Sequence, residues 1–184
     1  MSAVVYGYGS LIFRPDLEFD RAEWACLRGF KRRFYQGSTD HRGVPGAPGR
    51  VVTLLPSADD ACWGVAYHVN DSVFSAMLER LDRREVGGYE RYRVDLERLE
   101  GGMICDAIVY VATPSNPAYL GPAPWSEMAR QIYGARGPSG RNRDYVYDLA
   151  ASLRARQLDD AHVFRLEQEV RALHDGSSDP AGTR

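Results

Sequence analysis

Glu85 is the side chain in this sequence best placed to move a proton. It follows a predicted helix over residues 71–84, and the negative end of a helix dipole disfavours a carboxylate and raises its pKa. The adjacent Arg83 and Arg84 face other directions around the helix, so they need not neutralise it. These features suit a general acid/base, although many glutamates at helix ends are simply solvated.

A glycine-rich loop follows the first predicted strand and is the second candidate. Its glycines let the backbone approach a ligand, so that successive N–H groups can point at an anion. Dinucleotide binding is disfavoured, because Ile12 replaces the third glycine of that fingerprint and Pro15 stands where a helix should continue. A plain turn after the strand is the alternative interpretation. The candidate binding residues of the loop are Gly7, Tyr8, Gly9, Ser10, Leu11 and Ile12.

A second polar segment covers residues 36–50 and is dense in hydrogen-bonding side chains and turn residues. A loop that only joined two strands would not need this capacity, so the segment is a candidate binding loop. Just before it, three arginines alternate with phenylalanines in a predicted strand. We expect these arginines to form a solvated face and not a nucleic-acid contact. They are Arg28, Arg32 and Arg33.

Metal binding is not expected, because the sequence has neither a CxxC nor an HExxH motif and its histidines lie far apart. The cysteines, Cys26, Cys62 and Cys105, are odd in number and stand among apolar or strand-forming neighbours. We expect them to be reduced and buried.

The composition excludes several classes of protein. The chain has 184 residues, 44% hydrophobic and 26% charged, with a formal net charge of -2. This length fits one well-packed domain, and the charge gives no attraction to nucleic acid or to an anionic membrane. Apolar runs are far shorter than a bilayer span, and the N-terminus lacks a signal-peptide pattern. We therefore expect a soluble, cytoplasmic protein.

Strand patterns dominate the first two thirds of the sequence and helical patterns the last third, which predicts an α+β fold. One helix, over residues 71–84, should pack on a curved sheet. The six predicted strands cover residues 3–6, 25–35, 50–55, 62–69, 89–96 and 103–112. Three later helices carry the apolar residues of 125–133, 146–153 and 163–173, with Ser126 and Ser139 or Asn142 as N-cap candidates. We expect a single domain over residues 1–174 and a disordered tail over 175–184, which has nothing to bury.

Five segments, in matching order and at compatible spacings, make the sequence resemble the ChaC family of glutathione-specific γ-glutamylcyclotransferases. The resemblance runs from Val4 to Val170, and Phe13, Tyr35 and Val86 are mild departures from the pattern. The five segments are residues 8–12, 33–46, 84–89, 116–124 and 137–142.

This resemblance implies a mixed, barrel-like sheet with flanking helices and a helical C-terminal third. It also implies cleavage of glutathione to 5-oxoproline and cysteinylglycine, with Glu85 as acid/base and residues 7–12 binding the γ-glutamyl group. Arg42 and Tyr145 are further substrate contacts suggested by their chemistry and motif context. Because the α-amine of the substrate can attack its own γ-carbonyl, no cofactor, metal or protein nucleophile is expected, and no obligate protein partner is inferred.

Two alternatives stay open. One is a cyclotransferase for other γ-glutamyl amides or dipeptides, against which residues 36–46 argue because they resemble the glutathione-specific branch. The other is a non-catalytic module that binds a peptide or protein on the same fold, against which the presence of Glu85 argues.

Overall fold

The computed structural model describes residues 2–70, 72, 74 and 88–176. Most of the predicted helix over 71–84 therefore lies outside the described residues, and so does Glu85. The same holds for residues 177–184 of the predicted tail. The last helix ends at Gly176, so it continues into the first residues of the range predicted as tail.

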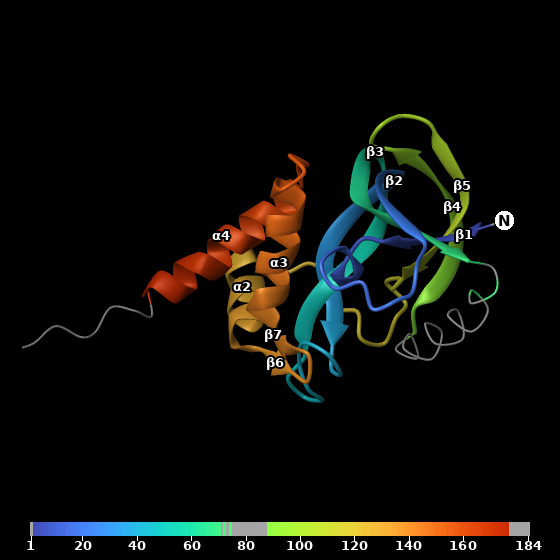
Figure 1. The fold of residues 1–184 in the computed structure, drawn as a ribbon. Helices are drawn as coiled ribbons and strands as arrows, with labels where there is room; N and C mark the ends of the chain where they lie inside the picture. The colour runs from blue at the N-terminus through green and yellow to red at the C-terminus, as the bar shows by residue number, and fades with distance from the viewer. Residues whose placement is uncertain (1, 71, 73, 75–87, 177–184) are drawn as a thin grey trace, which may run out of the picture. The chain divides into compact units, whose positions relative to one another are not determined.

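The described residues form a closed β-barrel with the strand order β1-β3-β2-β4-β5 (Figure 1). β1 pairs antiparallel with β3, and a parallel pairing of Val5 with Ile108 on β5 closes the ring. The predicted α+β fold with a barrel-like sheet is confirmed. The strands are β1 Ser2–Gly7, β2 Arg21–Ser38, β3 Gly49–Asn70, β4 Glu90–Arg98 and β5 Met103–Val111.

One long strand, β3, replaces two strands that the sequence predicted separately. Pro56 and the polar residues after it interrupt the apolar pattern, which favours a turn when the sequence is considered alone. In the structure the strand continues through this stretch, which is mostly exposed, while the apolar residues on either side are buried. The break in the pattern therefore marks a change of burial and not an end of the strand.

The chain divides into two compact units, which are described separately. The first unit is Met1–Arg33 with Val52–Tyr119, and the second is Phe34–Val51 with Leu120–Arg184. β2 and β3 contribute residues to both units. The single domain over residues 1–174 stays a prediction.

The three cysteines are free, and Cys26 and Cys62 are buried as expected, but Cys105 is exposed. It lies at a bulge in the pairing of β4 with β5, where Leu96 pairs with Ile104 and Val94 with Ala107. Two residues of β5 thus stand opposite one residue of β4. A bulge breaks the regular alternation of faces, and the apolar neighbours of Cys105 gave no sign of it.

Helices make up most of the second unit, and no helix among the described residues is long and apolar enough to cross a membrane. Their apolar faces are buried, with Met128, Leu149 and Leu166 fully covered. A short hairpin of β6 Arg136–Gly137 and β7 Gly140–Arg141 lies between the first two helices. The helices are α2 Trp125–Gly134, α3 Asn142–Arg154 and α4 Ala161–Gly176, as the apolar spacing predicted.

A buried carboxylate on α4 links α3 to α4. The Glu167 side chain is 4% exposed, with Oε2 2.5 Å from Arg154 Nη2 on α3 and Oε1 2.9 Å from Arg171 Nη2 one turn along α4. Burial alone would raise the pKa of Glu167, but hydrogen bonds and charge from the two arginines outweigh it, and the pKa is lowered. The ionised carboxylate therefore stabilises the helices of this unit.

We expect Glu167→Gln to lower the melting temperature at neutral pH. The melting temperature of this variant should also fall less than that of the wild type when the pH is lowered. Because the pKa of Glu167 in the folded protein lies below its ordinary value of 4.5, its stabilisation is complete above that pH and is lost as the pH falls through the lowered pKa. Hydrogen bonds to charged groups typically contribute about 1.5–3 kcal/mol. Thermal unfolding by circular dichroism measures both effects, and identical acid profiles of mutant and wild type would contradict the assignment.

Candidate functional site

The loop after β1 folds back on the strand that precedes it. Residues Ser10–Ile12 form a short 3-10 helix, η1, in which the Ile12 N–H donates to the Gly9 carbonyl at 3.0 Å. A Cβ on Gly7 would lie 2.6 Å from Leu11 Cβ, so glycine is required for this close approach. The side chains of Leu11 and Ile12 pack on the core of the first unit. The predicted binding residues 7–12 thus form one tight turn.

Three hydrogen bonds join this loop to other strands, two from side chains of those strands and one from the loop's own tyrosine. Arg32 Nη1 on β2 donates to the Tyr8 carbonyl at 2.9 Å, and Tyr67 Oη on β3 donates to the Leu11 carbonyl at 2.5 Å. Burial raises the pKa of Tyr67 to about 12, so its hydroxyl keeps the proton that it donates. The Tyr8 hydroxyl in turn donates to the Tyr110 carbonyl on β5 at 2.8 Å. The loop is therefore fixed through its carbonyls and through one of its side chains.

The backbone amides at the start of the turn, unlike its carbonyls, are not used to hold the turn. The first N–H groups of a helix have no partner within that helix, and the first donor inside this turn is Ile12. Gly9, Ser10 and Leu11 are half-buried, and their N–H groups are not donors in the turn. Consecutive amides of this kind can donate to a carboxylate or to a developing oxyanion.

Arg32 lies at the candidate site and is buried, contrary to the prediction from the sequence. It was expected on a solvated face, yet it is 2% exposed, and its Nη2 also donates to the carbonyl of Trp63 on β3. Arg28 does match the expectation, because it is exposed and pairs with Glu97. The missed signal was the spacing, since Arg32 and the buried Phe34 are two residues apart and therefore share one face of the strand.

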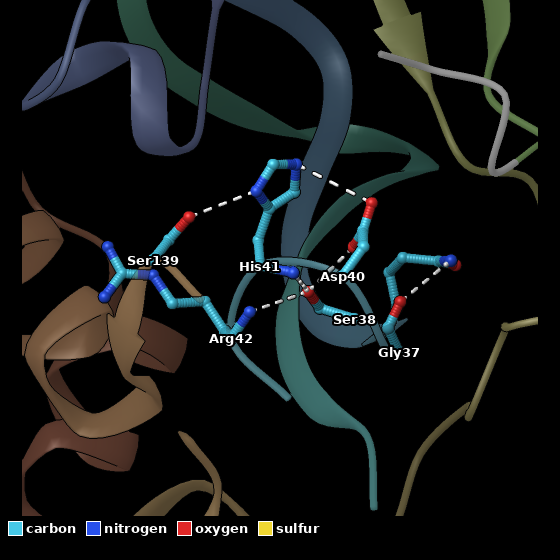
Figure 2. Close-up of polar contacts among 7 residues, drawn as sticks. Gly37, Ser38, Asp40, His41, Arg42 and Ser139 are labelled. Carbon is cyan, nitrogen blue, oxygen red and sulfur yellow. Dashed lines mark hydrogen bonds and ion pairs between the residues drawn. The ribbon is translucent and has the colours of Figure 1, made fainter. Parts of the chain in front are cut away.

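The polar segment in the second unit places a histidine between a serine and an aspartate (Figure 2). His41 Nδ1 lies 3.1 Å from Ser139 Oγ, and Nε2 lies 3.6 Å from Asp40 Oδ2. The side chains of His41 and Asp40 are 49% and 66% exposed. Ser38 shapes the backbone here, because its Oγ accepts the Arg42 N–H at 3.0 Å. The segment therefore presents polar groups to solvent from an ordered backbone, as a binding loop would.

Glycines let the β6–β7 hairpin lie directly on this polar segment. A Cβ on Gly137 would lie 2.3 Å from the His41 carbonyl and 2.6 Å from the Gly43 carbonyl. The Ser139 N–H donates to the His41 carbonyl at 2.9 Å. The hairpin thus fixes His41 through both its backbone and its side chain, so the imidazole depends on residues almost a hundred positions further along the chain.

The structure brings together Arg42 and Tyr145, which were predicted as substrate contacts. The Arg42 guanidinium carbon lies 5.5 Å from the centre of the Tyr145 ring, and Arg42 Nη1 donates to the Arg141 carbonyl at 3.0 Å. Both side chains are buried, and Tyr145 packs edge-on against Phe34. Within the second unit, the two buried side chains therefore support the polar segment from the protein interior.

The second unit has a polar core that the sequence did not predict, centred on Arg50. Its guanidinium donates to the Phe34 carbonyl at 3.1 Å, the Gly121 carbonyl at 2.9 Å and Gln131 Oε1 at 2.7 Å. The buried Asn142 side chain bonds to both the N–H and the carbonyl of Arg50, at 2.6 and 2.8 Å. Asn142 is therefore a backbone partner and not a cap.

The other predicted caps are not formed either. Pro124 and Arg141 occupy the N-cap positions of α2 and α3, and neither makes a side-chain cap hydrogen bond. Ser139 contacts His41 instead. Ser126 is the second residue of α2, so it lies inside the helix and cannot cap it.

The predicted site residues fall in different parts of the chain. Residues 7–12 belong to the first unit, and Arg42 and Tyr145 to the second. Glu85 lies outside the described residues. Within the described ranges, no three His, Cys, Asp or Glu side chains are grouped so as to hold a metal ion.

Comparison with known proteins identifies relatives along almost the whole chain. The chain is 42% identical to glutathione-specific gamma-glutamylcyclotransferase 1 of Danio rerio, over 91% of this chain and 88% of that protein. It is 43% identical to the Homo sapiens protein of the same name, over 90% of this chain and 77% of that protein.

A crystal structure of a yeast gamma-glutamylcyclotransferase specific to glutathione matches the fold with a TM-score of 0.86 and 28% identity, over 93% of this chain and 96% of that one. The ChaC-like protein family matches residues 3–173. The chain therefore belongs to the ChaC-like family.

Proposed function

We propose that this protein is a glutathione-specific γ-glutamylcyclotransferase that releases 5-oxo-L-proline and L-cysteinylglycine. The observation that carries the proposal is the 42% identity, along 91% of the chain, to a protein that bears this name. The anchored loop after β1 supports it, because it offers backbone donors in a fixed geometry. We further propose that the enzyme works in the cytoplasm, with glutathione as its small-molecule partner.

In the proposed reaction the substrate supplies its own nucleophile. The α-amino nitrogen of the γ-glutamyl group attacks the γ-carbonyl carbon and closes a five-membered lactam. The amide bond to cysteine breaks, and the departing nitrogen takes up a proton. The enzyme must hold the chain in a bent conformation and move that proton. Well-oriented intramolecular reactions reach effective molarities of about 10⁵–10⁸ M.

Glu85 is the proposed acid/base in this reaction. It takes a proton from the attacking amine and later gives one to the leaving nitrogen, so its protonation state is restored at the end of the cycle. This assignment rests on the sequence and on the family resemblance. Proton transfer by one positioned side chain typically accelerates a reaction by about 10²–10⁴-fold.

Residues 7–12 are the proposed γ-glutamyl site. Their backbone N–H groups would bind either the substrate carboxylate or the oxyanion that develops on the γ-carbonyl. A turn whose carbonyls are already bound by Arg32 and Tyr67 supports this role, because little reorganisation is needed when the substrate arrives.

Residues 36–46 are proposed to contact the cysteinylglycine portion and so to select glutathione. The polar cluster of Asp40, His41 and Ser139 supplies donors and acceptors for a peptide of this kind. Arg42 and Tyr145 remain part of the proposed substrate site. Their burial favours a contribution through the shape of the segment.

The proposal is tested by incubating the purified protein with glutathione and measuring 5-oxoproline. We expect glutathione to have a higher kcat/KM than γ-glutamylalanine, because the shorter dipeptide lacks the groups that residues 36–46 would bind. Equal specificity constants would favour a general γ-glutamylcyclotransferase. Binding of a peptide without any release of 5-oxoproline would favour a non-catalytic module.

We expect Glu85→Gln to remove nearly all turnover while the protein still folds. The amide keeps the shape of the carboxylate but cannot accept the proton, so kcat should fall by about 10²–10⁴-fold. The assay follows 5-oxoproline with both proteins at matched folded concentrations, checked by circular dichroism. Activity close to wild type would exclude Glu85 from the mechanism.

We expect Gly137→Ala to raise the KM for glutathione and to reduce its preference over γ-glutamylalanine. The new Cβ would lie 2.3 Å from the His41 carbonyl, so the hairpin must move away from the polar segment and His41 loses its support. Gly134→Ala is the matched control, because a Cβ there meets nothing within 4 Å. If the two variants had the same preference for glutathione over γ-glutamylalanine, residues 36–46 would not determine substrate specificity.

A further inference from the structure

We propose that Arg32 is a positioning residue, which orients the Tyr8–Gly9 peptide so that the Gly9 N–H is directed at the γ-glutamyl group. The inference rests on the proposed function, since that function assigns residues 7–12 to the substrate. It concerns a buried charged side chain on β2 that the proposed chemistry does not itself use.

The environment of Arg32 indicates a geometric role. A guanidinium stays protonated in proteins, and burying it is costly unless its donors are satisfied. Arg32 is 2% exposed, and two of its nitrogens donate to backbone carbonyls, those of Tyr8 and Trp63. Apolar side chains often replace buried charged groups without loss of stability. What an apolar side chain could not supply is the bridge between the loop and β3.

Peptide geometry links this bridge to the candidate donor. The Tyr8 carbonyl and the Gly9 N–H belong to one peptide group, and the described chain contains no cis peptide bond. In a planar trans peptide the C=O and N–H bonds point in opposite directions. Because the Tyr8 carbonyl points at the guanidinium, the Gly9 N–H must point away from it. Arg32 therefore sets the direction of this amide without touching it.

This peptide would otherwise be easy to reorient. Its direction depends on ψ of Tyr8 and φ of Gly9, and glycine accepts a wide range of φ. The Tyr67 hydroxyl fixes the carbonyl of Leu11, which is three residues further on and belongs to a different peptide group. The Tyr8 side chain is held at its hydroxyl by the Tyr110 carbonyl, but the ring can stay in place while the peptide turns. Arg32 acts directly on the peptide, because its Nη1 donates to the Tyr8 carbonyl.

The test compares Arg32→Met, which removes both donors, with Arg32→Lys, which keeps the charge but lacks the planar fork. We expect Arg32→Met to raise the KM for glutathione by about tenfold or more, as the loss of one well-placed hydrogen bond would. Arg32→Lys should give a smaller rise. A purely structural role would lower the fraction of folded enzyme, and thus the apparent kcat, without changing KM.

Thr53→Val is the matched control. Thr53 is fully buried in the same unit, and its hydroxyl donates to the Ala112 carbonyl at 2.6 Å and not to a residue of the loop. We expect this variant to melt at a lower temperature and to keep the wild-type KM. A wild-type KM in both Arg32 variants would overturn the proposal. So would a rise in KM for Thr53→Val equal to that for Arg32→Met.

A second readout does not depend on activity. In protein labelled with ¹⁵N-glycine, the Gly9 amide resonance should shift in Arg32→Met and stay in place in Thr53→Val. If Arg32→Met does not fold, Arg32→Lys carries both measurements. A wild-type protein that does not cleave glutathione would refute the proposed function. An active wild type, with KM and the Gly9 resonance unchanged in the Arg32 variants, would refute only the role of Arg32.

Discussion

The hydrogen bond from the Arg32 guanidinium to the Tyr8 carbonyl is the interaction on which the loop after β1 most depends. Regular secondary structure would pair both the carbonyls and the amides of the chain. Here buried side chains bind the Tyr8 and Leu11 carbonyls, so the turn is held without using the amides at its start. A turn can be rigid and still have amides available to a ligand when it is held through its carbonyls. A buried guanidinium can hold a turn in this way, because it has several donors in one plane.

The second unit solves a related problem in the same way. The Asn142 side chain bonds to the N–H and the carbonyl of Arg50, in the manner of a neighbouring strand. The Arg50 guanidinium then binds the Phe34 and Gly121 carbonyls, although burial lowers its pKa. Backbone groups of β2 and β3 on either side of the polar segment thereby gain side-chain partners. Such networks are stabilising when every member is bonded, so loss of one member should affect the whole segment.

The apolar periodicity of the sequence predicted the elements that bury one face. The three C-terminal helices and the barrel strands followed from apolar spacing, because each buries one face. The apolar spacing could not show that β3 continues through Pro56, because an exposed stretch of strand and a turn can both be rich in polar residues. It also could not show that Arg32 points inward, because charge was taken as a sign of solvent although the shared face with Phe34 indicated burial. Asn142 was expected as a cap because its local sequence cannot reveal a partner 92 positions away.

The arrangement fits a reaction whose nucleophile belongs to the substrate. The Asp40, His41 and Ser139 cluster has the residue types of a catalytic triad, but its histidine and aspartate side chains are 49% and 66% exposed, and the Ser139 amide is already bonded to the His41 carbonyl. That amide cannot serve an oxyanion, and an exposed imidazole gains little from its carboxylate in water. The cluster is therefore suited to binding a polar substrate and not to attacking it.

An intramolecular cyclisation requires a bent substrate and one group that carries a proton. Its rate then depends on how firmly the backbone donors are held in place. Under the proposed function, Arg32 would contribute to such a reaction by orienting a peptide, a role that no count of titratable groups near the substrate would reveal.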